Sequence, residues 1–186
     1  MSTLKVDTIL KRTGTGTITV GQSGDTISIP SGATLSNQGT TVPTSFGKIL
    51  QVVQGSTTTE VSTTTSGSFT DTGLTASITP ASTSNKVLVL VAQHFMITRS
   101  SSLARAQVNV LRDSTTIFTP NNWTINMQQT GSDLAHSTML AFNILDAPSS
   151  TSSLVYKSQM KPESSSTVKS QQNGNQSNII LMEVAG

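Results

Sequence analysis

About a third of this 186-residue chain is Ser or Thr, and no other feature narrows the possible folds as much. Hydroxyl side chains compete for nearby backbone groups, so they are poor residues for a helix interior. Thr, like Val and Ile, instead fits the pleated surface of a β-sheet. No long window of the sequence shows a helical period. We therefore expect an all-β, turn-rich protein without substantial helix.

Ionisable side chains are scarce, which narrows the possible functions. Only 11% of the residues are charged, against roughly 25% in typical domains, Cys is absent and there are two His. The largest basic cluster is the pair Lys11 and Arg12, so we expect no nucleic-acid partner.

Residues 1–10 lack the apolar region of a signal peptide, and the longest apolar run, residues 87–92, is too short to span a membrane. We therefore expect no membrane partner either.

Residues 1–45 form a Thr/Gly/Ser-rich part in which Thr17–Val20 recurs in similar form as Thr26–Ile29. Short β-segments between Gly-rich turns predict a β-helical or extended shaft, although a flexible linker has a similar composition. The aliphatic residues of this part are too sparse to bury one another within one chain. They are Ile18, Val20, Ile27, Ile29 and Leu35. Since burying one such side chain contributes roughly 1.5–3 kcal/mol, we expect three chains to share them in a homotrimer.

Residues 46–186 contain a series of short strand patterns and are expected to form a head domain. The predicted strands cover residues 48–54, 58–64, 68–72, 74–79, 86–98, 104–112, 115–118, 137–145, 154–160 and 178–184. In the strongest of them, Val87, Val89 and Val91 are expected to point inward. Leu88 and Leu90 are expected to face a second layer or another subunit. This many short strands predicts an antiparallel β-sandwich of jelly-roll type.

No residue pattern predicts catalysis, a cofactor or a metal site. His94 lies in a strand that we expect to be buried, with its imidazole hydrogen-bonded or at an interface. Asp133 and His136 have no third metal ligand nearby in sequence, and a Gly-x-Ser-x-Gly motif is absent. We therefore expect that the protein is not an enzyme. The single Trp, Trp123, lies in a polar loop and is a candidate receptor contact through stacking on a glycan. The alternative is that it closes the sandwich end or a subunit seam.

The first residues of the chain combine spaced aliphatic side chains with charged ones. The aliphatic residues are Leu4, Val6, Ile9 and Leu10. Nothing nearby in sequence can cover them, so this segment is expected to dock on another protein. A frayed terminus is the alternative.

Seven β motifs lie along the chain, at residues 4–9, 16–20, 24–35, 48–53, 71–80, 85–89 and 180–186. Together they resemble a group of small structural proteins of tailed bacteriophages, frequent in marine phages. The resemblance covers nearly the whole chain and is weakest at residues 95–129. It implies a virion component, such as a tail fibre, a head fibre or a capsid-decoration protein, usually trimeric. The N-terminal segment would then attach to a capsid, portal or tail protein, and the head would project outward. The alternative function is a lectin-like fibre tip that binds a host-surface glycan for attachment.

Overall fold

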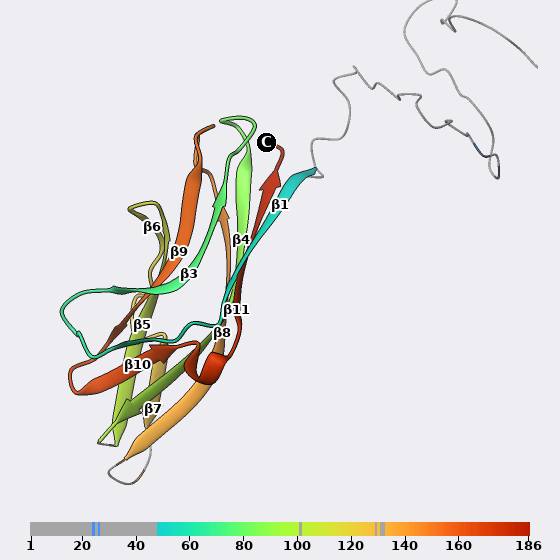
Figure 1. The fold of residues 1–186 in the computed structure, drawn as a ribbon. Helices are drawn as coiled ribbons and strands as arrows, with labels where there is room; N and C mark the ends of the chain where they lie inside the picture. The colour runs from blue at the N-terminus through green and yellow to red at the C-terminus, as the bar shows by residue number, and fades with distance from the viewer. Residues whose placement is uncertain (1–23, 25, 27–47, 101, 129, 131–132) are drawn as a thin grey trace, which may run out of the picture. The chain divides into compact units, whose positions relative to one another are not determined.

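The computed structural model describes residues 24, 26, 48–100, 102–128, 130 and 133–186. Within these residues the fold is an all-β sandwich of two antiparallel sheets (Figure 1), which confirms the predicted fold class of the head. The helical content of the described residues is one short 3-10 turn, η1 (Gln172–Gly174). All the aliphatic residues predicted for the anchor and the shaft lie outside the described residues.

The two sheets, called sheet A and sheet B, divide the strands almost equally. Sheet A contains β1 (Ile49–Thr57), β2 (Val61–Thr63), β4 (Lys86–Arg99), β8 (Leu134–Asp146), β10 (Ser166–Ser170) and β11 (Ser177–Val184). Sheet B contains β3 (Thr70–Ile78), β5 (Leu103–Arg112), β6 (Thr115–Phe118), β7 (Ile125–Gln128) and β9 (Leu154–Pro162). β4 pairs with β8 along one edge and with both β10 and β11 along the other, which makes it the centre of sheet A.

The strand pairs are nested in the way that defines a jelly roll. β5 pairs with β6 and β7, β4 with β8, β3 with β9, and β1 with β11. Along this antiparallel ribbon, the β5 pairs lie in sheet B, the β4–β8 pair in sheet A and the β3–β9 pair in sheet B. The last two pairs, β2–β10 and β1–β11, both lie in sheet A, so the ribbon wraps around one core. This wrapping produces the jelly-roll topology found in viral capsid and lectin domains.

Alternating side chains of β4 divide between the core and the outer face of sheet A. Val87, Val89 and Val91 are almost completely buried, as the sequence predicts, whereas Leu88 and Leu90 are half-buried on the outer face. The largest side chains between the sheets belong to Phe95, Ile97, Tyr156, Met160, Ile179 and Leu181. Burial of each apolar side chain contributes roughly 1.5–3 kcal/mol, so this layer holds the sheets together.

Paired hydroxyl and amide groups allow a Ser/Thr-rich chain to form this core. The Ser158 hydroxyl donates to Oε1 of Gln93 at 2.7 Å and lies 2.5 Å from Oγ1 of Thr72. All three residues are fully buried. Gln93 belongs to sheet A and the other two to sheet B, so these hydrogen bonds connect the layers. Buried polar groups that find partners in this way cost little stability and fix the packing.

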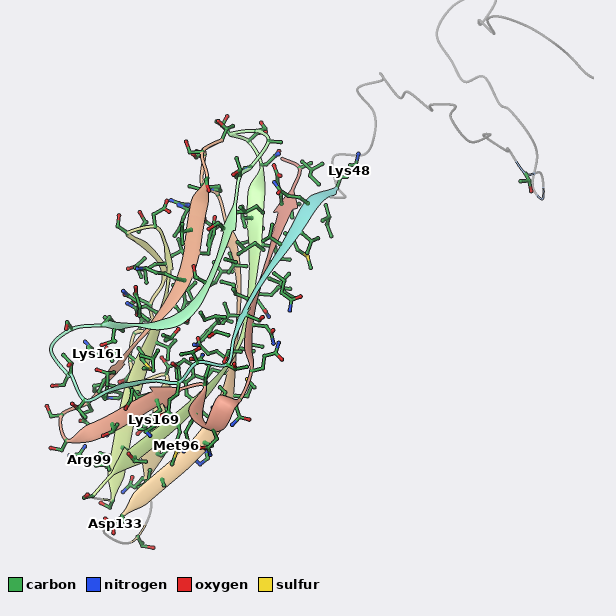
Figure 2. All side chains as sticks on the ribbon, viewed as in Figure 1. Lys48, Met96, Arg99, Asp133, Lys161 and Lys169 are labelled. Atoms are coloured by element: carbon green, nitrogen blue, oxygen red, sulfur yellow. The ribbon has the colours of Figure 1, made fainter. Side chains whose placement is uncertain are left out.

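The two ends of the sandwich are distinct and are called proximal and distal below. The proximal end contains Lys48, the loop 79–85 and Ala185, whose backbone N–H donates to the carbonyl of Lys48 at 2.9 Å. The distal end contains Arg99 and Asp133. Figure 2 shows Lys48 at one end of the sandwich and Arg99 and Asp133 at the other. Residues 1–47 therefore join the head at its proximal end.

Candidate functional site

A buried carboxylate holds the proximal end together. Glu183 on β11 is 1% exposed and accepts hydrogen bonds from Gln51 Nε2 (2.6 Å), the backbone N–H of Ala81 (2.6 Å) and Asn85 Nδ2 (2.5 Å). Burial raises the pKa of Glu183, but these three donors outweigh it and hold the pKa below its ordinary value. The carboxylate thus ties β1 and the loop 79–85 to β11.

A second polar group connects the two sheets. The guanidinium of Arg112 on β5 donates to both oxygens of Asp146 on β8, at 2.8 and 2.6 Å. The Tyr156 hydroxyl donates to Oδ2 of the same carboxylate at 2.7 Å. Burial, together with the bond to Asp146, raises the pKa of Tyr156. These side chains are paired to one another and have a structural role, because each bond joins sheet A to sheet B.

At the distal end, Glu163 bridges two arginines from different sheets. Its Oε2 lies 3.0 Å from Nη1 of Arg99, on β4, and its Oε1 lies 3.6 Å from Nη1 of Arg105, on β5. Between a fifth and a third of each of these side chains is exposed. The distal end is therefore charged and open to solvent, in contrast to the proximal carboxylate.

Trp123 lies next to this charged group. Its ring centroid is 6.0 Å from the Arg105 guanidinium, whose Nε donates to Asn126 Oδ1 at 3.2 Å. The Trp123 side chain is half-buried, on the loop between β6 and β7. An aromatic ring beside amide and guanidinium groups offers stacking and hydrogen bonding at one place. The sequence analysis identified Trp123 but not Arg105 and Asn126. These two residues become neighbours because β5 pairs with β7.

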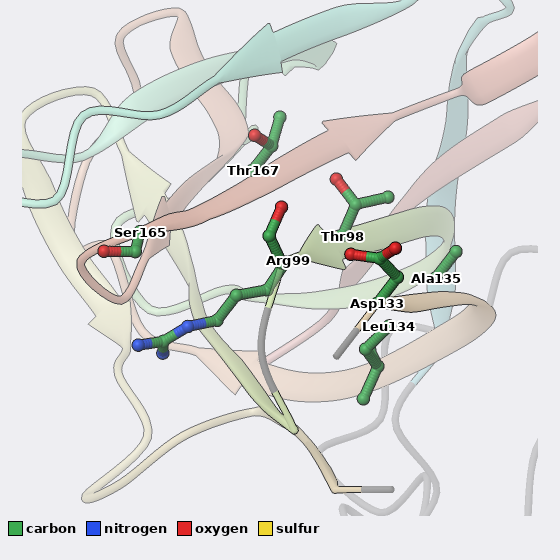
Figure 3. A pocket seen from close by; sticks show the side chains of 8 residues that line it. Thr98, Arg99, Asp133, Leu134, Ala135, Ser165 and Thr167 are labelled. Carbon is green, nitrogen blue, oxygen red and sulfur yellow. The ribbon is translucent and has the colours of Figure 1, made fainter. Parts of the chain in front are cut away.

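An open pocket of about 290 Å³ lies at the same end (Figure 3). It is lined by Thr98, Arg99, Ser100, Asp133, Leu134, Ala135, Ser165 and Thr167. Figure 3 shows the Arg99 side chain extending past Ser165. Arg99 Nε is buried without a hydrogen-bond partner among the described residues. The lining contains one cation and one carboxylate residue, which suits a polar ligand better than an apolar one.

The outer face of sheet A is apolar across its whole width near the proximal end. One row of paired residues crosses four strands and consists of Val52, Met182, Leu88 and Leu145. The next row consists of Gln54, Ile180, Leu90 and Asn143. Val52 and Leu145 are each 57% exposed. Alternation places these side chains opposite to the core, so no other layer of the described head covers them.

The outer face of sheet B is charged instead. Lys157 Nζ and Gln159 Nε2 both donate to the Asp71 carboxylate, at 2.8 and 2.7 Å. Lys161 lies over the Phe69 ring, with its Nζ 4.8 Å from the centroid. A cavity of about 190 Å³ lies beside Asp71 and Lys157, where β3 carries a register shift. The two outer faces therefore differ sharply in polarity.

The two histidines are not among the pocket-lining residues, although His136 directly follows Ala135, which lines the distal pocket. His94 is buried as expected, but its Nδ1 has no hydrogen-bond partner in the described part of the chain, and burial lowers the pKa of the imidazole. His136 lies on β8, in register with Ile97. Within the described ranges, no three His, Asp or Glu side chains are placed to hold a metal ion. No helix of that part is long and apolar enough to cross a membrane.

Comparisons with known proteins give structural neighbours only. No family model matches the chain, and no curated protein does. A VP2 subviral particle of infectious bursal disease virus has 13% identity and a TM-score of 0.37, over 73% of this chain and 39% of that one. A VP2 mutant of the same virus, in T=1 particles, has 14% identity and a TM-score of 0.32, over 73% and 36%. The chain spans less than two fifths of the length of these capsid proteins. A likeness this low assigns no function.

Proposed function

We propose that this chain is a structural protein of a tailed-phage virion, a trimeric fibre or capsid-decoration component rather than an enzyme. Residues 1–12 attach it to a capsid, portal or tail protein, and the jelly-roll head projects outward. The observation that carries this proposal is that the two ends of the head differ. The preceding 47 residues join one end of the sandwich, whereas the charged pocket and Trp123 belong to the opposite end. Such a molecule can be tethered at one end while it exposes a polar surface at the other.

The attachment is tested on particles of the virus that encodes the chain. Replacing Leu4, Val6, Ile9 and Leu10 together by Ser removes the apolar side chains that nothing in the segment covers. We expect the variant to form a folded head with unchanged circular dichroism and to be missing from purified particles. The matched control replaces Thr3, Lys5, Asp7 and Thr8 by Ser and should be incorporated normally. Incorporation of the first variant at normal copy number would place the anchor elsewhere.

Glycan recognition is the second candidate function, and the position of Trp123 favours it. The half-buried ring lies beside the Arg105 guanidinium, whose Nε donates to Asn126 Oδ1, near the distal end. A glycan array with the intact protein and with Trp123→Ala tests this function. Phe69→Ala is the control, because Phe69 also lies under a cation on sheet B but belongs to another loop. Binding that is lost in Trp123→Ala alone supports recognition, whereas the absence of binding by the intact protein rejects it.

A further inference from the structure

The apolar outer face of sheet A is large enough to contribute part of a protein interface. Over residues 86–92 of β4 and their partners on β1, β8 and β11, it measures roughly 20 by 20 Å from the spacing of strands and residues. This corresponds to a projected area of about 400 Å², polar side chains such as Gln54 and Asn143 included. The largest apolar patches on monomers have a similar size and are often functional. The projected area is also about half of the area that each partner buries in a standard interface.

The charge of this face is compatible with contact between identical copies. Among the described residues of its rows, Lys86 is the one charged side chain, and the remainder are aliphatic, Met, Ala or uncharged polar residues. Two copies of such a face do not repel each other, and the row of Val52, Met182, Leu88 and Leu145 supplies an apolar centre. A strongly charged partner would find a single charge here, that of Lys86.

The entry point of the N-terminal segment favours a further copy of this chain as the occupant. Residues 1–47 join the head at β1, the edge strand that contributes Leu50 and Val52 to the apolar face. If this face turns toward a symmetry axis, the first residues of β1 in all copies come together. That is the arrangement in which the sparse aliphatic residues of segment 14–35 can share burial.

We propose that the outer face of sheet A is the self-association surface of the head and packs against further copies of this chain around a three-fold axis. The proposal rests on the trimer in the proposed function and assigns its interface. The charged face of sheet B then points away from the axis. The distal pocket stays accessible in the assembly.

Charge substitutions on the two outer faces test this assignment in the full-length protein. Val52→Glu and Leu145→Glu place a carboxylate on the apolar face, and Val155→Glu is the control on sheet B, where Val155 is 39% exposed. Light scattering over a concentration series should find trimers for the intact protein and for the control. The two sheet A variants should dissociate at concentrations at least roughly tenfold higher than the control. Thermal melting verifies that each head is folded.

The outcomes separate this interface from the trimer itself. If Val52→Glu and Leu145→Glu form trimers with the same dissociation constant as the control, the proposed interface is wrong. The trimer itself is not contradicted by that result. A monomeric intact protein at micromolar concentration overturns both.

A second measurement uses the absence of Cys, since an introduced thiol is then the only one in the chain. In the assembled protein, Val52→Cys and Leu145→Cys should react with a maleimide at least roughly tenfold more slowly than Val155→Cys, because an interface core excludes solvent. Equal rates at the three positions contradict the proposal. Protected thiols in a monomer contradict it as well and indicate that residues 1–47 of the same chain cover the face.

Discussion

The two ends of the sandwich each contain a glutamate that joins separate strands, but the surroundings of these carboxylates are opposite. Glu183 at the proximal end is 1% exposed and has three uncharged hydrogen-bond donors. Glu163 at the distal end lies between two arginines, with a quarter of its side chain exposed. A buried carboxylate that relies on fixed donors requires a rigid surrounding, whereas a hydrated ion pair tolerates motion. The comparison indicates that the proximal end, where the N-terminal segment joins, is built more tightly than the distal end.

The largest effect is expected for Glu183→Gln. The amide has nearly the same shape, but its NH₂ group must face one of three donors that all need an acceptor. Loss of hydrogen bonds to a buried charge should lower the free energy of unfolding by about 2–4 kcal/mol. Urea denaturation followed by circular dichroism measures this change.

The control for this experiment is Glu60→Gln, because Glu60 is exposed and its partners are the Lys169 side chain and the backbone of Asn173. It should leave the denaturation midpoint unchanged within error. If Glu183→Gln has the same denaturation midpoint as Glu60→Gln, the buried carboxylate contributes no more stability than an exposed ion pair. The proximal end would then not be tightly built.

The difference in stability between wild type and Glu183→Gln should depend on pH. The pKa of Glu183 in the folded protein lies below the ordinary value of 4.5. The carboxylate therefore contributes its full stabilisation above about pH 4.5, and this contribution is lost as the pH falls through the lower, folded pKa. Denaturation series at descending pH should show the two proteins converging. A difference that is constant across this range would mean that the charge of Glu183 has no part in the stabilisation.

Strong hydrophobic alternation made much of the fold predictable. The patterns of residues 86–98, 104–112, 154–160 and 178–184 each correspond to a strand, and Val87, Val89 and Val91 point into the core. β10 and β7 were not predicted. β10 (Ser166–Ser170) consists of Ser, Thr, Val and Lys, and it becomes a strand because β4 and β2 pair with it. The two predicted strands at 68–72 and 74–79 are one strand, in which Gly73 adopts φ +80° at a register shift.

The candidate sites were less predictable because they depend on contacts between distant strands. The sequence identified Trp123 as an unusual residue, but not the charged group of Arg99, Arg105 and Glu163 beside it. Glu183 lies within an apolar strand pattern, and its donors Gln51, Ala81 and Asn85 are 132, 102 and 98 residues away in sequence. One signal could have revealed it: a lone carboxylate on the inward side of an otherwise apolar strand needs buried donors. The apolar face of sheet A was indicated in part, since Leu88 and Leu90 were expected to face a further layer or subunit.

The smallest effect is expected for Glu163→Gln at the distal end. Its ion pairs with Arg99 and Arg105 are partly exposed, so solvent screens them and the side chains lose entropy when they are held in place. We expect the free energy of unfolding to fall by only about 0.5–1 kcal/mol, and less at high salt. The salt dependence distinguishes the two ends, because the loss in Glu183→Gln comes from buried neutral donors and should change little between low and high salt. A loss in Glu163→Gln that matched Glu183→Gln and resisted salt would mean that both ends are equally rigid. The open, hydrated character inferred for the distal end would then be wrong.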